Sequence, residues 1–257
     1  MGVKKLSRND ILRIDGKRVP VAIRLNPRAR RLIVKVHPST GEVAVVAPHE
    51  RSVTKAIEFL RGEREWIATR LAKVPPLVAM TPGATVPYRG TDFIIRNAPR
   101  EGKGPVWIDQ EAARPTLRVA GRPEHTPRRV EDWLKKQAKA QLKRRVDYYA
   151  GELGLTPGKI TVRDASSRWG SCSTGGNLSF SWRLIMAPNY VLDYVAAHEV
   201  AHLREMNHGT RFWRLLERLL GDTGEAAQAW LRDHGSTLHR FTAARGKDGM
   251  DDLPEAA

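Results

Sequence analysis

Short apolar segments separated by turn residues characterise about the first 120 residues, a pattern typical of β-strands. The predicted strands span 18–25, 31–37, 42–47, 85–95, 105–109 and 116–120. Between the third and fourth strands, apolar residues recur at helical spacing from Ser52 to Lys73, and the pair Pro75-Pro76 ends that helix. The N-terminal part is therefore predicted to consist of strands and one helix.

The rest of the chain is predicted to be mainly helical. A long basic helix extends from about Pro127 to Leu153, because apolar residues line one side of it. Two strands at 159–165 and 177–184 precede three helices at about 188–206, 209–220 and 223–240. No internal repeat is evident. We expect an α+β fold with a basic, β-rich N-terminal region at 1–125, a helical catalytic region at 126–240 and a disordered tail at 241–257.

Composition places the chain among ordinary globular proteins. It has 257 residues, of which 41% are hydrophobic, enough for a core in one large domain or two small ones. No apolar run approaches the length needed to cross a bilayer, and the N-terminus lacks the apolar region of a secretory signal. The single Cys172 excludes an intramolecular disulfide framework. We therefore expect a cytoplasmic protein that does not associate with membranes.

Charge is distributed unevenly along the chain. Residues 1–145 hold 32 Lys and Arg against 14 Asp and Glu, whereas residues 146–257 hold 12 against 14. A strongly basic region attracts polyanions, so we expect association with nucleic acid; a solvated basic surface is an equally weighted alternative. The predicted contact surface is the exposed face of the long helix, with Lys135, Lys136, Lys139, Lys143 and Arg144.

Candidate chemistry is concentrated in the HExxH pattern from His198 to His202. Positions four apart on a helix are rotated by only about 40° and separated by about 6 Å, so both imidazoles project from one face and reach one metal ion. Glu199 lies beside that face and is placed to take a proton from a metal-bound water. The flanking residues are apolar, and two His and a Glu on a buried helix are costly unless they are paired or bind metal.

Three residues compete for the position of third metal ligand. His208 would face away from the metal on a continuing helix, so the chain must turn after about Met206, for which Asn207 and Gly209 offer left-handed backbone angles. Glu205 stays on the correct face but lies about 10 Å along the helix axis from His198. Glu217, on the following helix, is the third candidate. His208 is favoured over Glu217, and Glu205 ranks last.

Several segments together resemble the YgjP-like zinc metallopeptidase family, which is related to SprT-type proteases and other zincins. The resemblance extends from about residue 18 to 240 and rests on RARRLIVKV (28–36), VAPHE (46–50), FLRGEREWI (59–67), SRWGSCS (167–173), NLSFSWRLIMAP (177–188), DYVAAHEVAHL (193–203) and NHGTRFW (207–213). It implies a zincin-like metallopeptidase fold with His198, His202 and His208 as metal ligands and Glu199 as the catalytic carboxylate. Members are catalogued both as peptidases and as nucleotide phosphohydrolases, so no substrate is implied.

Other residues near the motif have weaker functional interpretations. Strand 177–184 stands where zincins have an edge strand that pairs with extended substrate. Tyr194, one turn before His198, is a candidate for stabilising an oxyanion, although a structural role is favoured. Trp169 is a candidate substrate contact, although core packing is favoured for it.

Our leading hypothesis is a cytoplasmic zinc metallopeptidase with one Zn²⁺ per chain and a peptide or protein substrate. Water would be activated by zinc and Glu199. Two alternatives stay open. One is a zinc-dependent nucleotide phosphohydrolase, against which counts the lack of a Gly-rich phosphate loop. The other is a nucleic-acid-associated protein in which zinc is structural, with its coordination closed by protein ligands.

Overall fold

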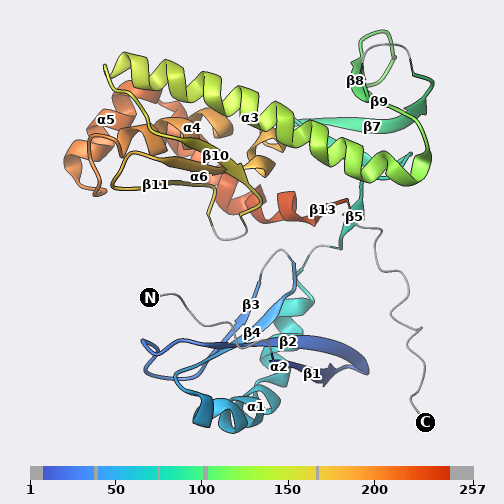
Figure 1. Ribbon diagram of the computed structural model, residues 1–257, viewed down its shortest axis with the longest axis vertical. Coiled ribbons are helices and arrows are strands. Elements are labelled where there is room, and N and C mark those ends of the chain that lie inside the picture. Colours follow the sequence, from blue (N-terminus) through green and yellow to red (C-terminus); the bar gives the residue numbers. More distant parts are fainter. Residues whose placement is uncertain (1–7, 38–39, 75, 101–103, 166–167, 244–257) are drawn as a thin grey trace. The chain divides into compact units, whose positions relative to one another are not determined.

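The computed structural model describes residues 8–37, 40–74, 76–100, 104–165 and 168–243. The chain divides into two compact units, Met1–Pro76 and Leu77–Ala257 (Figure 1). Both units combine helices with β-sheets, so the α+β class expected from the sequence is confirmed. The division falls after Pro76, whereas we expected one after residue 125. The strands between these points share a hydrophobic core with the HExxH helix, which explains why they belong to the second unit.

The first unit is a four-stranded sheet followed by two short helices. The elements are β1 (Arg8–Ile14), β2 (Lys17–Leu25), β3 (Ile33–Val36), β4 (Val43–Ala47), η1 (Glu50–Ser52), α1 (Val53–Gly62) and α2 (Arg64–Leu71). The strand order is β1-β2-β4-β3, in which β2 and β4 are parallel. Strand β1 was not predicted, and the single helix predicted for 52–73 is interrupted at Glu63, which follows Gly62 and has non-helical backbone angles.

The second unit contains a second four-stranded sheet, a three-stranded sheet and the long helices. Its elements are β5 (Val78–Ala79), β6 (Thr85–Tyr88), β7 (Thr91–Ala98), β8 (Val106–Asp109), β9 (Thr116–Ala120), η2 (Pro123–His125), α3 (Thr126–Glu152), β10 (Ile160–Arg163), β11 (Gly170–Cys172), β12 (Leu178–Ser181), η3 (Trp182–Met186), α4 (Asn189–Ala201), α5 (Thr210–Leu220), α6 (Thr223–His234), η4 (Gly235–Arg240) and β13 (Phe241–Thr242). None of the helices among the described residues is long and apolar enough to cross a membrane.

The sheets β1–β4 and β6–β9 have the same topology. The order β6-β7-β9-β8 repeats β1-β2-β4-β3, and each sheet leads through a 3-10 turn into a helix. Corresponding register pairs are Val21↔Val43 with Ile94↔Thr116, and Ile33↔Val46 with Val106↔Val119. In both comparisons, each residue of the second sheet lies 73 positions after its counterpart in the first sheet. The repeat escaped the sequence analysis because side chains at equivalent positions differ in character, for example buried Val45 and half-buried Arg118.

The three-stranded sheet lies beside the HExxH helix and has the order β10-β12-β11. The strand expected at the sheet edge, 177–184, is therefore its central strand, and it ends at Ser181, where η3 begins. The edge beside α4 is instead β11, antiparallel to β12. Strand β11 was missed because its residues, Gly170-Ser171-Cys172, are small and carry no β-strand signal.

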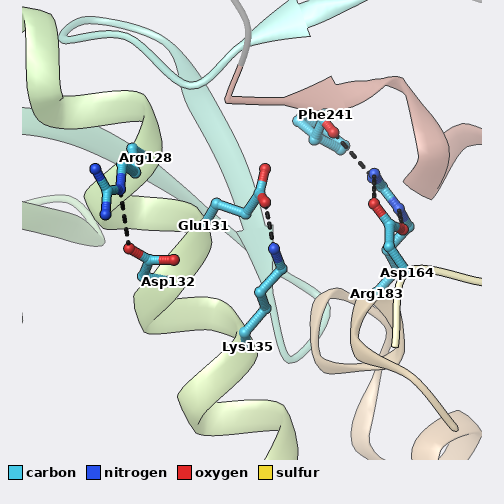
Figure 2. A network of polar contacts seen from close by, with 7 residues as sticks. All are labelled: Arg128, Glu131, Asp132, Lys135, Asp164, Arg183 and Phe241. Atoms are coloured by element: carbon cyan, nitrogen blue, oxygen red, sulfur yellow. Dashed lines mark hydrogen bonds and ion pairs between the residues drawn. The ribbon is translucent and has the colours of Figure 1, made fainter. Parts of the chain in front are cut away.

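Buried side chains explain the two central helices. Helix α3 buries one apolar stripe, whereas most residues of α4 are buried, so α4 lies in the interior of the second unit. Arg183, only 7% exposed, ties the C-terminal segment to this core (Figure 2). It makes two bonds to Asp164, of 2.8 and 3.1 Å, and donates to the carbonyls of Leu238 and Phe241 at 2.9 Å each. Of the tail expected to be disordered, Phe241–Thr242 pair in parallel with β5, and 244–257 lie outside the described residues.

Candidate active site

Three histidines converge at the C-terminal end of α4. His198 lies in the last turn of the helix, His202 follows its last residue, and the next loop returns His208 to the same point. The ring nitrogens that they offer lie within 4.8 Å of one another. The Nε2 atoms of His198 and His208 are 3.0 Å apart. Within the described part of the chain, these three residues form the cluster of side chains able to hold a metal ion.

The turn that brings His208 back to the other two histidines begins earlier in the chain than the sequence indicated. Helix α4 ends at Ala201 and not near Met206, and the chain tightens through bonds from Leu203 to Val200 and from Arg204 to Ala201, of 3.0 and 3.1 Å. These are i→i−3 bonds, which commonly close the last turn of a helix. Gly209 has φ −83°, so the left-handed backbone expected there is not used.

Each histidine is oriented through its surroundings. Nδ1 of His202 lies 3.0 Å from the carbonyl oxygen of Glu205, which makes Nδ1 the protonated nitrogen and leaves the Nε2 lone pair free. The Tyr194 hydroxyl lies 3.5 Å from Nδ1 of His198, at the outer limit of a hydrogen bond. The indole of Trp213 donates to the His208 carbonyl at 3.0 Å, which fixes the loop that carries this residue.

A phenylalanine forms the floor of the cluster. Phe212 is fully buried, and its ring centroid lies 4.9, 4.6 and 4.7 Å from those of His198, His202 and His208. It lies in the first turns of α5 and therefore couples the position of this helix to all three imidazoles. Rings packed in this way lose rotational freedom, so the cluster is preorganised for a shared ligand.

The electrostatics of the cluster suit a cation. Burial, together with the neighbouring rings of His202 and His208, lowers the pKa of His198 to about 4. Burial also lowers the pKa of His202. Neutral imidazoles keep a nitrogen lone pair available, which metal binding requires. The donor set therefore fits a metal ion that prefers nitrogen ligands.

Glu199 is buried beside this cluster but is not part of it. It is 6% exposed, and burial raises the pKa of its carboxyl group to about 7, although Arg168 acts in the opposite direction. A group with a pKa near neutrality is well matched to accept and release a proton. A Cβ atom added at Gly170 would lie 2.5 Å from Oε1 of Glu199, so only glycine lets the edge strand β11 pass this close to the carboxyl group.

The other two candidates for a metal ligand, Glu205 and Glu217, do not belong to the cluster that the described residues form. The backbone carbonyl of Glu205, and not its carboxylate, contacts the cluster through His202. Glu217 lines a pocket of about 610 Å³ between α4, α5 and α6. Tyr194 and Trp213, which both contact the His198 ring, form one wall of this pocket. The acidic residues on it are Glu217, Asp222 and Glu225.

Trp169, for which core packing was favoured, and Trp182 are buried to different degrees. Trp182 is fully buried, whereas Trp169 is half-buried and packs against His239, with ring centroids 5.2 Å apart. His239 is itself buried, with 8% of its surface exposed. Cys172 is half-buried, and burial together with Glu199 raises the pKa of its thiol. This thiol is accordingly protonated and poorly suited as a nucleophile.

Sequence reasoning missed several residues that shape the site. Gly170 and Phe212 carry no catalytic chemistry, and Trp213 acts through a single indole hydrogen bond. The segment from Asn207 to Trp213 was noted as a motif, but roles were assigned only to its histidine and to the turn residues Asn207 and Gly209. An aromatic pair one helical turn after a candidate ligand, as Phe212-Trp213 after His208, is a usable signal, because metal ligands need a rigid support.

Comparison with known proteins identifies the family. A family model described as the YgjP-like metallopeptidase domain matches residues 30–234. Among solved structures, the metallopeptidase zymogen of Pyrococcus abyssi abylysin is similar at 19% identity and a TM-score of 0.33, over 37% of this chain and 92% of that one. No curated protein matches the chain. The family match spans most of the chain, including both histidines of the HExxH motif, His208 and Glu199, and the protein therefore belongs to the YgjP-like metallopeptidase family.

Proposed function

We propose that the protein is a zinc-dependent peptidase in which His198, His202 and His208 hold the metal and Glu199 is the catalytic carboxylate. The observation that carries this proposal is the convergence of three imidazole nitrogens within 4.8 Å at the end of the helix that also presents Glu199. Three nitrogen donors without a carboxylate ligand suit zinc, and such a set leaves one coordination position for a reactant.

Zinc in this position would supply Lewis acidity, which polarises the peptide carbonyl and lowers the pKa of water. Glu199 would accept a proton from the attacking water at a carboxylate oxygen and deliver it to the amine nitrogen of the leaving group. Its buried position supports this role, because a carboxyl group with a raised pKa both takes and releases a proton near neutral pH. Tyr194 would orient His198 through the contact between its hydroxyl and Nδ1.

The substrate would bind in extended form along β11. This strand is the sheet edge beside Glu199, and its unpaired backbone groups can hydrogen bond to a peptide with little dependence on sequence. This assignment replaces the central strand β12, whose two sides are already occupied by β10 and β11.

The adjacent pocket would receive a substrate side chain next to the cleaved bond. Tyr194 and Trp213 line this pocket and also contact the ring of His198. Three carboxylate side chains line the pocket as well. We expect this arrangement to favour a Lys or Arg side chain, whose apolar stem suits Leu216 and Leu220. The same carboxylates would repel a triphosphate, which weighs against the phosphohydrolase alternative.

The test compares Glu199→Gln with Glu205→Gln. Both changes replace a carboxylate by an amide, but only the first removes the proposed proton acceptor. Glu199→Gln should retain about one zinc per chain and lose at least about 100-fold in kcat on an unfolded protein substrate. Glu205→Gln should keep both properties, and His208→Ala should lose zinc. Cleavage sites are identified by mass spectrometry, and phosphate release from nucleoside triphosphates is measured in parallel.

Full activity of Glu199→Gln would remove this residue from the mechanism. Zinc-dependent phosphate release without peptide cleavage would replace the peptidase proposal by the phosphohydrolase alternative. Cleavage without enrichment of basic residues would discard only the assignment of the pocket.

A further inference from the structure

A basic groove lies on the second unit between α3 and β10. It has a volume of about 640 Å³, and α3 and β10 pack side by side along it (Figure 1). Its cationic side chains come from both elements and the residue before β10: Lys135, Lys136, Lys139, Lys159 and Arg163. The sequence singled out the lysines of α3, but not that Lys159 and Arg163 face them across a groove.

Most of these cations are not neutralised by neighbours. Lys135 forms an ion pair with Glu131 (Figure 2). Asp164, the acidic residue that follows β10, accepts hydrogen bonds from Nε and Nη2 of Arg183 (Figure 2). The other four cations form no ion pair with any described residue, and all four are exposed: Lys136, Lys139, Lys159 and Arg163. The groove therefore presents a net positive surface to an anionic ligand.

The chemistry of the groove favours a phosphate backbone over an acidic peptide. Strand β10 is an edge strand, but the charged side chains on and beside it oppose the addition of another strand, because pairing would desolvate them. Trp182 lies beneath the groove and is fully buried, so it offers no face on which bases can stack. Contacts to phosphates need neither a free strand edge nor a stacking face.

We propose that the groove between α3 and β10 binds the phosphate backbone of nucleic acid without sequence preference. The net charge of +16 of the whole chain supplies long-range attraction to a polyanion, and the groove supplies the local contacts. Lys143 and Arg144, expected from the sequence to take part, do not line the groove, and Lys143 pairs with Asp147 at 2.5 Å.

The groove and the catalytic site occupy opposite edges of one sheet. Strand β10 borders the groove, β11 passes Glu199, and only β12 separates the two. Neighbouring strands are about 5 Å apart, so the two edges are separated by about 10 Å of backbone. Nucleic acid on β10 therefore leaves the edge of β11 open, and this inference does not depend on peptidase activity.

The test measures binding of the full-length protein to fluorescent 20-base-pair duplexes of two unrelated sequences between 50 and 200 mM salt. The groove variant is Lys136→Gln/Lys139→Gln/Lys159→Gln. The control is Arg211→Gln/Arg214→Gln/Arg218→Gln, which removes the same charge from exposed positions of α5 in the same unit. The groove variant should bind at least about tenfold more weakly at 100 mM salt, with a log–log salt slope shallower by about 2.7. The control should change affinity by less than about threefold, and the two duplexes should bind equally.

Three results would overturn the proposal. The first is no binding of the unaltered protein at 50 mM salt. The second is equal weakening by both triple variants, which would indicate diffuse attraction. The third is tighter binding of a polyglutamate peptide than of duplex, which would make an acidic polypeptide the occupant. Thermal unfolding checks that the groove variant is folded; if it is not, the single changes Lys139→Gln and Lys159→Gln should each make the slope shallower by about 0.9. Peptide hydrolysis should be unchanged in these variants.

Discussion

The sheets β1–β4 and β6–β9 share strand order and the register of their last three strands, but only the second sheet belongs to the unit that contains the histidine cluster. Both begin with a two-residue hairpin turn in which both residues have positive φ: Asp15-Gly16, at 49° and 77°, and Arg89-Gly90, at 53° and 80°. This is the turn whose twist matches that of the strands. The two modules therefore differ in what surrounds them and not in how they are built.

One difference is the contact made by the turn. The amides of Arg89 and Gly90 donate to the carbonyls of Ile185 and Met186 at 2.8 and 3.1 Å, which anchors η3 just before α4 begins. Gly90 also lies so close to Pro188 that an added Cβ would be 3.0 Å from its Cα. At the first turn, a Cβ added to Gly16 would meet nothing within 4 Å. The second turn thus holds the segment that leads into α4, and the first does not.

The other difference is the length of the helix that follows. Helix α1 ends at Gly62 after 10 residues, whereas α3 runs for 27 residues, about 40 Å, and packs against η3, α4 and β10 (Figure 1). The two modules bury separate hydrophobic cores. A sheet-and-helix module thus becomes a scaffold for the histidine cluster when its helix is extended and its turn contacts η3.

The largest effects on stability are expected when one buried leucine in the core of each unit is replaced by alanine. Leu134 in α3 and Leu60 in α1 are both buried, so Leu134→Ala and Leu60→Ala should each cost about 2–5 kcal/mol in the unit concerned. Zinc should stabilise only the second unit, because a ligand stabilises the state that binds it. Calorimetry with and without zinc should show a zinc-responsive transition lowered by Leu134→Ala and a second transition lowered by Leu60→Ala.

A single transition that zinc shifts as a whole would break the comparison, because the two units would then unfold together. Conservative changes at exposed positions of the same helices, Lys139→Gln and Lys55→Gln, serve as controls and should leave both transitions within about 0.5 kcal/mol.

The sequence predicted what depends on local periodicity and on strict spacing. The HExxH pair, α3 and most strands of both sheets followed from apolar spacing and turn residues, and so did the α+β class. Strand β11, the early end of α4 and the packing of Phe212 did not, because each depends on contacts between segments distant in the chain. The repeated topology was hidden for a related reason: the strand order and the pairing of β2 with β4 and of β7 with β9 are the same, but side chains such as Val45 and Arg118 meet different neighbours.

Ion pairs offer a second comparison of the units. In the first unit Arg24 and Glu42 pair at 2.5 Å with side chains 46% and 52% exposed, whereas the Arg183 side chain is only 9% exposed. Arg183→Met should cost about 2–4 kcal/mol, because two backbone carbonyls and Asp164 lose their donor. Arg24→Met should cost less than about 1 kcal/mol. Denaturant unfolding at pH 7 measures both values, and equal costs would contradict the assigned role of the buried pair.

The effect of Arg183 should also depend on pH. Burial alone would raise the pKa of Asp164, but the bonds from Arg183 outweigh it and hold that pKa below its ordinary value of 3.8. A carboxyl group with a lowered pKa contributes stability above its unfolded pKa and loses it as the pH falls through its folded pKa. The difference between the unaltered protein and Arg183→Met should therefore narrow below about pH 4. If the difference in stability between the two proteins instead widened as the pH fell, the assigned interaction between Arg183 and Asp164 would be contradicted.

The smallest effects are expected from the two hairpin turns. Gly16→Ala places a Cβ on a left-handed residue in open space and should cost about 1 kcal/mol in the first unit. Gly90→Ala has the same backbone cost, and the new Cβ would also crowd Pro188. We therefore expect this substitution to destabilise the second unit by about 2 kcal/mol. Because Pro188 immediately precedes α4, Gly90→Ala should also weaken zinc binding and peptide hydrolysis by a few fold, whereas Gly16→Ala should leave both unchanged. Equal costs of the two substitutions, or unaltered zinc affinity in Gly90→Ala, would show that the second hairpin turn does not position α4.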